Sequence, residues 1–239
     1  MNPDLLIFAA THFEISHFLT LHPGDSKHFT KTGLTIISGK VGHKTYDLLI
    51  TGPGVFNAAH ALTVYLEKSS PCLVLQTGIA GIFKQTGCNI GDVAIATREQ
   101  YIHTGIQTVS IENDPLPFDL IDKNLPTRKG VYLFEQENVD HYHEILSRAC
   151  LTKNINITKG PFITVSSITS SNKNADRLYS AFSPVMEAME GAACAHIALQ
   201  YDIPIIEVRS ASNYVGERDK SKWDIELAAK QLGWVCACI

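Results

Sequence analysis

The sequence predicts an α/β fold with three layers, αβα, in which helices cover both faces of a mixed, mainly parallel central sheet. Short apolar runs typical of buried strands alternate along the chain with longer segments of helical periodicity, and this alternation is typical of parallel strands joined by crossover helices. The chain has 239 residues, of which 45% are hydrophobic, and a chain of this size buries one sizeable core. We therefore predict a single domain over residues 1–239.

The candidate strands are short apolar runs bounded by polar or turn-forming residues. They comprise residues 5–10, 34–38, 48–51, 73–77, 93–97, 162–165 and 203–208. The candidate helices have apolar residues at helical spacing. They comprise residues 55–68, 139–151, 172–182, 186–201 and 225–232. The polar segment 98–128 is too long for an ordinary connection, and loops of this length are usually functional lids, contact surfaces or mobile segments.

Charge and hydropathy exclude several classes of protein. The formal net charge is -4 and the isoelectric point is near 6.2, so the chain lacks the basic surface of a nucleic-acid-binding protein. No apolar run is long enough to span a bilayer, and the N-terminal segment lacks the charged start and the long apolar region of a signal peptide. We expect a soluble protein of the cytoplasm with no membrane or nucleic-acid partner.

The cysteine and histidine patterns predict no metal site. Six cysteines are spread along the chain without a CxxC pair, the pattern of reduced thiols that mostly pack in the core. Cys236 and Cys238 form a lone CxC near the C-terminus with no second pair. His141 and His143 stand two apart on a predicted helix, where their side chains point in different directions.

Two glycine-rich turns follow candidate strands, where an α/β protein binds its ligands. The first, residues 51–59, contains Gly52 and Gly54 but has Asn57 where a dinucleotide-binding turn needs a third glycine. It also lacks the acidic residue that such a site carries about twenty positions further on. This turn either packs a helix tightly on the sheet or presents helix amide groups to an anion or a sugar hydroxyl.

The second turn, residues 76–81, reads Gln-Thr-Gly-Ile-Ala-Gly and lets a flat ring approach the backbone. It resembles the signature of the nucleoside phosphorylase and nucleosidase superfamily. Segments 8–14, 185–191 and 209–213 resemble that superfamily as well and occur in its order, so the likeness extends over residues 5–223. It implies a nucleoside phosphorylase-like fold. It also implies substrate contacts at Gly78, Ile79, Ala80 and Gly81.

Residues 213–223, Asn-Tyr-Val-Gly-Glu-Arg-Asp-Lys-Ser-Lys-Trp, most resemble the futalosine hydrolases within that superfamily. This likeness implies hydrolysis of the N-ribosidic bond of futalosine, with release of hypoxanthine, in the futalosine pathway of menaquinone biosynthesis. It also implies a homo-oligomer, a dimer or larger, in which a neighbouring chain closes the ribose side of the pocket. Ribosyl transfer of this kind needs neither a metal nor an organic cofactor.

Two glutamates are the candidates for holding the ribose and activating water. Glu190 lies at the start of a predicted helix, where amide dipoles favour a carboxylate that can accept hydrogen bonds from both ribose hydroxyls. Glu187, one turn earlier, is expected to be only a helix N-terminal acid. Glu14 follows the first strand, where the nucleosidases carry the carboxylate that positions and deprotonates water. A fixed carboxylate orients neutral water and repels a phosphate dianion, so Glu14 favours hydrolysis over phosphorolysis.

Arg209 and Asn213 are the further catalytic candidates. Arg209 matches a family arginine beside Glu14 and the water, and it either orients them or forms an ion pair that holds the strand end. Asn213 stands where adenine-releasing nucleosidases carry aspartate, and an amide has no titratable proton to donate. Its donor and acceptor suit the N7 and N1–H/O6 edge of a 6-oxopurine. We therefore expect hypoxanthine to be the leaving base, with Asn213 stabilising its developing negative charge.

Four further residues are candidate substrate contacts. We expect Phe162 to lie against the purine and Met189 beneath the ribose, and both are equally compatible with the core. Futalosine carries a benzoate, for which Arg218 is the first candidate cation and Lys220 the second. The alternative is a solvated charged loop in which these cations pair with neighbouring acids.

The residues leave other functions open. The substrate can be 6-amino-6-deoxyfutalosine, since a rotated amide presents its oxygen to an exocyclic amine, or it can be methylthioadenosine and S-adenosylhomocysteine. A purine nucleoside phosphorylase needs a cationic phosphate pocket, and the six arginines show no cluster in the sequence near Glu14 or Gly78. A non-catalytic nucleoside-binding protein would keep Glu190 and the glycine turns and lose Glu14.

Overall fold

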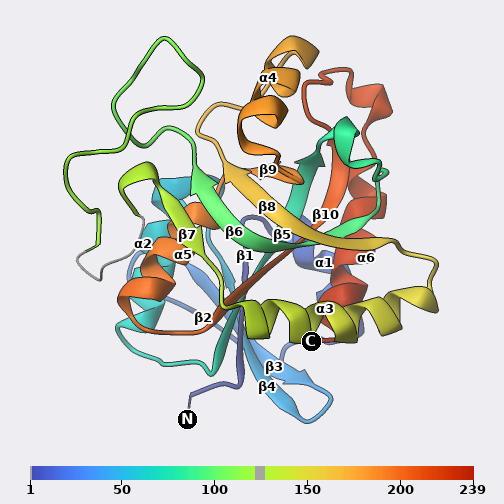
Figure 1. Cartoon of the computed structure of the whole chain (residues 1–239). Coiled ribbons are helices and arrows are strands. Elements are labelled where there is room, and N and C mark those ends of the chain that lie inside the picture. The colour runs from blue at the N-terminus through green and yellow to red at the C-terminus, as the bar shows by residue number, and fades with distance from the viewer. Residues whose placement is uncertain (1, 122–126) are drawn as a thin grey trace.

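The fold is built on a mixed, mainly parallel sheet, seen in a computed structural model that describes residues 2–121 and 127–239 (Figure 1). Its strands are β1 (Leu5–Ala9), β2 (Ser26–Phe29), β3 (Thr35–Val41), β4 (Lys44–Ile50), β5 (Leu73–Ile82), β6 (Val93–Tyr101), β7 (Val131–Leu133), β8 (Ile157–Thr164), β9 (Met186–Ala188) and β10 (Ile205–Tyr214). The helices are α1 (His12–Leu21), α2 (Val55–Leu66), α3 (Gln136–Leu151), α4 (Asn172–Phe182), α5 (Gly191–Gln200) and α6 (Ile225–Cys236). Short 3₁₀ helices are η1 (Lys84–Thr86), η2 (Thr127–Lys129) and η3 (Lys220–Lys222).

The helices form two layers, one on each face of the sheet. Helices α1 and α6 pack against each other on one face together with α3, while α2 and α5 pack together on the other (Figure 1). This arrangement confirms the predicted three-layer α/β architecture. Among the residues that the structure describes, no helix is both long enough and apolar enough to cross a membrane.

Strand β5 lies at the centre of the sheet because it pairs with three others. It is parallel to β1 and β10 and antiparallel to β9. The pairings of β10 with β6, β6 with β8 and β8 with β9 complete a closed circuit of strands, whereas β4, β3 and β2 extend outward from β1. Closure brings strand ends that are far apart in the sequence to one rim, and the candidate site lies at that rim.

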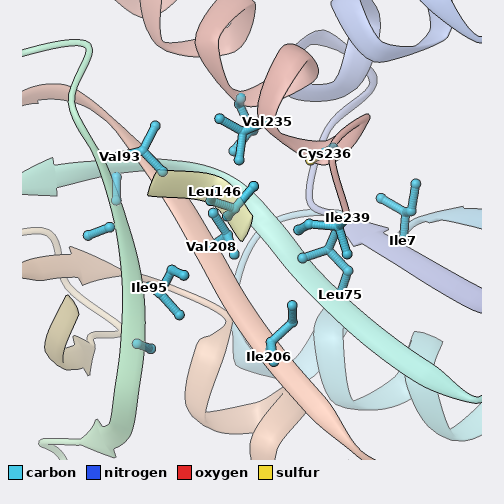
Figure 2. Close-up of a cluster of buried hydrophobic side chains, with 14 of the residues drawn as sticks. Ile7, Leu75, Val93, Ile95, Leu146, Ile206, Val208, Val235, Cys236 and Ile239 are labelled. Carbon is cyan, nitrogen blue, oxygen red and sulfur yellow. The ribbon is translucent and has the colours of Figure 1, made fainter. Parts of the chain in front are cut away.

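The main core fills the space between the sheet and the α3/α6 layer. Figure 2 shows Leu75 of β5 and Val208 of β10 packed beside Val235 of α6 and Leu146 of α3, all fully buried. Cys236 belongs to the same cluster, and its thiol lies 3.4 Å from the hydroxyl of Thr77. Burial raises the pKa of Cys236 to about 12, so this cysteine is a packing residue. All six cysteines are free thiols, and Cys72 is exposed.

The N-terminal helix α1 was not among the predicted helices. Its amphipathic pattern is short, but it begins with a capping box in which the Thr11 side chain accepts a hydrogen bond from Glu14 N and Glu14 accepts one from Thr11 N. Thr-x-x-Glu before an apolar run is a recognised helix start, and this signal could have located α1. The short strands β2, β7 and β9 were also not predicted.

Two predicted element boundaries are wrong in ways that affect the site. The helix predicted over 186–201 begins only at Gly191, because the preceding residues form β9 between β5 and β8. The strand predicted over 203–208 continues to Tyr214 as β10, with an irregularity between Ala211 and Asn213. Of the predicted loop 98–128, the first residues belong to β6, and residues 122–126 lie outside the described chain.

Candidate active site

A cavity of about 220 Å³ opens at the C-terminal ends of β1, β5, β8, β9 and β10, the edge where α/β sheets bind ligands. Seven predicted site residues line it: Glu14, Ile79, Ala80, Gly81, Met189, Glu190 and Asn213. Residues that were not predicted as contacts complete the wall: Ala10, Thr11, Pro53, Val165, Ile168, Thr169, Glu187, Ala188, Ser212, Val215 and Trp223. The closed circuit of strands therefore gathers residues from five strand ends into one pocket, to which Pro53 and Trp223 are added from two further segments.

Glu14 is held in the pocket wall by three hydrogen bonds. Its Oε2 accepts from the Thr11 amide at 2.8 Å and from the Thr11 hydroxyl at 2.9 Å, and its Oε1 accepts from Ile79 N at 3.0 Å. Burial raises the pKa of Glu14 above its ordinary value, while Arg209 and the Thr11 hydrogen bond oppose this shift. A fixed carboxylate with a raised pKa is suited to take a proton from a neutral nucleophile.

Gly78 makes the approach of Glu14 and Arg209 possible. A Cβ atom at this position would lie 2.7 Å from Arg209 Nη1 and 2.9 Å from Glu14 Oε1, closer than side chains tolerate. Gly78 is not among the described residues that line the cavity, and its predicted substrate contact stays a prediction. The glycine is needed because two charged side chains cross the strand there.

Glu190 stands immediately before α5 and faces the cavity. Its Oε1 accepts a hydrogen bond from Gly54 N at 2.9 Å, and its Oε2 lies 3.2 Å from Arg209 Nη2. Gly54 and Gly52 both have positive φ angles, 93° and 85°, which glycine adopts without strain. The first glycine turn therefore fixes a carboxylate of the pocket, which is a third role beside the two that the sequence left open.

Arg209 lies in β10, fully buried, and joins the carboxylates of the site. Its Nε donates to Glu207 Oε1 at 2.7 Å and its Nη1 donates to the Ile79 carbonyl at 3.3 Å. Burial lowers the pKa of Arg209, but Glu207 and Glu190 raise it to a net value above the ordinary one. The ion pairs therefore fix Arg209 beside Glu190 and Glu207, which agrees with the ion-pair alternative, and the role of orienting water stays a prediction.

Glu99 and Glu207 form a buried carboxyl pair behind Arg209 that the sequence reasoning missed. Glu99 Oε1 and Glu207 Oε2 have no hydrogen-bond donor among the described residues, and both lie within 2.4 Å of where a Cβ on Gly191 would stand. Burial and then the neighbouring Glu207 raise the pKa of Glu99 well above its ordinary value. A proton held by Glu99 therefore lets the two groups face each other.

This carboxyl pair connects the helix α5 to the arginine. The Thr164 hydroxyl accepts from Ala192 N at 2.8 Å and donates to Glu99 Oε2 at 2.7 Å. The chain of contacts continues through Glu207 to Arg209. An acid inside an otherwise apolar strand, as in Ile-Ile-Glu-Val-Arg, is the sequence signal that could have revealed this network.

Asn213 and Glu187 face the cavity from two strands that flank β5. Asn213 Oδ1 lies 2.9 Å from the Ser212 hydroxyl, and Asn213 Nδ2 donates to the Tyr214 carbonyl at 3.0 Å. Glu187 was expected to be a helix N-terminal acid, and this is wrong, because it belongs to β9 and binds Thr169. Burial raises the pKa of Glu187.

The two apolar residues predicted to contact substrate lie in different places. Met189 lines the cavity, but Phe162 is fully buried in the main core and is not among the described lining residues. Strand β8 directs Phe162 toward the interior, since it pairs with Met186 in the sheet. Val165 and Ile168, which follow β8, line the cavity instead.

The basic residues Arg218, Lys220 and Lys222 after β10 are not among the described residues that line the cavity. The Arg218 guanidinium stacks over the Trp223 ring at 5.2 Å, and Trp223 is itself a lining residue. Lys220 is exposed on η3. Lys222 pairs with Glu217 at 3.0 Å, whereas Arg218 lies against the pocket wall through its contact with Trp223.

Carboxylates, glycine turns and a buried arginine meet at the strand ends, an arrangement that suits an α/β protein acting on nucleosides. The chain belongs to the phosphorylase superfamily, whose family model matches residues 4–236. It is 26% identical over 201 residues to the 5'-methylthioadenosine/S-adenosylhomocysteine nucleosidase of Oceanobacillus iheyensis, with 84% of this chain and 82% of that protein covered. The corresponding Bacillus cereus enzyme is 28% identical over 198 residues, covering 82% and 79%.

Solved structures share the fold at lower identity. The 5'-methylthioadenosine/S-adenosylhomocysteine nucleosidase of Neisseria meningitidis superposes with a TM-score of 0.81 and 19% identity, covering 98% of this chain and 96% of the other. Futalosine hydrolase of Helicobacter pylori gives a TM-score of 0.78 and 18% identity, again covering 98% and 96%. The architecture around the pocket is therefore that of the superfamily.

Proposed function

We propose that this protein hydrolyses the N-ribosidic bond of a purine nucleoside, that the leaving base is hypoxanthine, and that the nucleoside is futalosine. One observation carries the proposal: a fixed carboxylate, Glu14, and an amide, Asn213, line the same cavity. The carboxylate favours water over phosphate as the nucleophile. The amide supports departure of a base without a titratable proton from the protein.

In the proposed reaction, Glu14 orients a water molecule and takes one of its protons as the water oxygen bonds to C1' of the ribose. The bond from C1' to the purine N9 breaks, and its electron pair leaves with the base. Glu190, fixed by Gly54 and Arg209, accepts hydrogen bonds from the ribose hydroxyls. Asn213 donates to the departing ring, and the proton taken from water finally neutralises the base. No metal or organic cofactor takes part in these steps.

Hydrolysis is supported over phosphorolysis by the charges around the pocket. Arg209 is the arginine next to Glu14 and Gly78, but its guanidinium already contacts Glu207, Glu190 and the Ile79 carbonyl. A phosphate dianion would have to compete with these carboxylates for the guanidinium and would be repelled by them.

Futalosine is supported as the substrate by the basic turn beside Trp223, a lining residue of the cavity. Arg218 is placed over Trp223, which lines the pocket, and guanidinium binds carboxylate in a planar, bidentate manner. Lys220, the first residue of η3, is the second candidate partner for the benzoate. A neighbouring copy of the chain would close the ribose side in the homo-oligomer that the futalosine hydrolase likeness implies.

The second candidate function is a 5'-methylthioadenosine/S-adenosylhomocysteine nucleosidase. The relatives with 26–28% identity carry this name, which favours it over any other alternative. Asn213 speaks against it, since adenine is a poor leaving group without a proton donor at N7. The same argument applies to 6-amino-6-deoxyfutalosine, which also releases adenine, although a rotated amide could present its oxygen to the exocyclic amine.

The test is release of base from futalosine, 6-amino-6-deoxyfutalosine, inosine and methylthioadenosine, each with and without phosphate. We expect hypoxanthine from futalosine in both conditions and little reaction with the other three. Adenine release from methylthioadenosine would establish the second candidate. Dependence on phosphate would identify a phosphorylase, and binding of nucleoside without any turnover would identify a non-catalytic protein.

A further inference from the structure

Glu187 lies in the wall of the cavity and takes no part in the proposed chemistry. It belongs to β9 and is almost fully buried, with 6% of its surface exposed. Thr169 holds it twice, with the Thr169 amide donating to Oε1 at 3.0 Å and the Thr169 hydroxyl donating to Oε2 at 2.5 Å. A buried carboxylate with both oxygens fixed in the wall of a pocket is positioned to bind a ligand.

Strand register places Glu187 in one row with Asn213. Gly81 of β5 pairs with Asn213 of β10 on one side and with Glu187 of β9 on the other, so the two polar side chains stand on the same face of the sheet, two strands apart. Two strand spacings amount to about 10 Å. Gly81 between them has no side chain, and a Cβ there would lie 3.0 Å from Val215 Cγ2 and 3.4 Å from Asn213 Nδ2. Gly81 and Val215 both line the cavity, so they offer a flat ring an apolar wall between the two polar groups.

The edge of a purine offers this row two different patterns. Atom N7 is an acceptor in both 6-oxopurines and 6-aminopurines, so a donor from Asn213 does not separate them. Atom N1 carries a hydrogen in a 6-oxopurine and a lone pair in a 6-aminopurine. A side chain that faces N1, at the end of the ring away from N7, can therefore discriminate the two bases, in addition to any group that faces the substituent at position 6.

We propose that Glu187 accepts a hydrogen bond from N1–H of the leaving base and thereby selects 6-oxopurines against 6-aminopurines. This inference rests on the proposed function, since it requires the cavity to bind a purine. Thr169 is the positioning residue, because its two hydrogen bonds fix both carboxylate oxygens of Glu187.

The electrostatics of Glu187 explain the direction of the selection. Burial raises the pKa of Glu187 to a net value above the ordinary one, while the two Thr169 hydrogen bonds oppose this shift, because they favour the ionised form. Each oxygen accepts one bond from Thr169 and keeps a further lone pair for the ligand. Hypoxanthine satisfies that lone pair with N1–H, whereas adenine would turn its own lone pair toward a buried carboxylate.

The test is the affinity of the free bases hypoxanthine and adenine, measured by isothermal titration calorimetry, for wild type and for Glu187→Gln. We expect the wild type to bind hypoxanthine roughly 10- to 100-fold more tightly than adenine, the range of one hydrogen bond to a charged group. The Gln amide either accepts from N1–H or donates to N1, so the variant should bind both bases to a similar degree. Glu226→Gln, an exposed acid on α6, is the matched control and should keep the wild-type ratio.

Three outcomes would overturn the inference in distinguishable ways. A Glu187→Gln variant that melts like the wild type and keeps its preference for hypoxanthine would show that Glu187 does not read N1. A wild type that prefers adenine would overturn the inference and favour the methylthioadenosine alternative. A wild type that binds neither base would overturn the proposed function itself.

Discussion

The buried charges around Arg209 and the exposed charges of the turn at 217–222 show two different uses of ion pairs in one molecule. The side chains of Arg209, Glu190 and Glu207 are at most 6% exposed, and Arg209 pairs with both glutamates. In the turn, Lys222 pairs with Glu217 while 60% of its side chain remains in solvent. Buried charges without partners are strongly unfavourable, whereas exposed pairs contribute little. The first region therefore fixes geometry, and the second is free to meet a ligand.

Removing the buried cation should give the largest effect on stability. In Arg209→Met, Glu207 and Glu190 lose their shared partner inside the protein, and we expect the free energy of unfolding to fall by about 3–5 kcal/mol. Urea denaturation measures this change. Lys222→Met, the matched change in the exposed turn, should stay within about 0.5 kcal/mol of wild type. Equal losses in both variants would remove the distinction between the two regions.

Replacing the water-activating carboxylate should affect turnover more than binding. Glu14→Gln keeps the shape of the side chain and the hydrogen bond from Ile79 N, but an amide takes up no proton. We expect kcat to fall by about 10²- to 10⁴-fold with a small change in KM. Steady-state kinetics with Glu226→Gln as the control measures both constants. A variant with a kcat near that of the wild type would exclude Glu14 as the base.

The buried carboxyl pair should make stability depend on pH. The folded pKa of Glu99 lies well above its ordinary value, so its stabilising contribution is complete below the unfolded pKa and is lost as the pH rises through the folded pKa. In Glu99→Gln this titration disappears. Melting curves over a pH series should show wild type losing stability toward alkaline pH and the variant losing less, by up to about 1.4 kcal/mol per pH unit. An equal change of stability with pH in wild type and in Glu99→Gln would contradict a proton shared between Glu99 and Glu207.

The smallest predicted effect concerns the exposed turn. Arg218→Ala should raise KM for futalosine about tenfold and leave KM for inosine unchanged, because only futalosine carries a carboxylate that a guanidinium can bind. Lys222→Ala, whose lysine is paired with Glu217, is the control and should change neither value. An equal rise in KM for both nucleosides after Arg218→Ala would assign Arg218 to packing on Trp223.

The parts of the site that follow local patterns were predictable from the sequence. The predicted turn over residues 76–81 is wrong, because these residues continue β5 to Ile82, but its glycine pattern still located Gly81 near the strand end. Residue chemistry picked out Glu14, Glu190 and Asn213, which the structure gathers in one cavity. Apolar periodicity located α4 within its observed bounds. These signals succeed because each depends on a few consecutive residues.

The parts that depend on contacts between distant strands were missed. Glu187 looked like a helix acid because β9 is only three residues long and is defined by its pairing with β5 and β8. Phe162 looked like a pocket wall because its direction is set by the register of β8. The pair of Glu99 and Glu207 joins β6 to β10, 108 positions apart, and sequence periodicity carries no information about such a pairing.

The most direct test of the account is the fate of the water oxygen. The enzyme would act on futalosine in water labelled with heavy oxygen, with phosphate present, and mass spectrometry would identify the sugar product. Attack by a water molecule that Glu14 activates predicts a sugar carrying the heavy oxygen, equal amounts of hypoxanthine, and loss of both in Glu14→Gln. A sugar phosphate without the label would contradict the central claim. It would show that phosphate is the nucleophile, although Glu14, Glu190 and Glu207 were inferred to repel it.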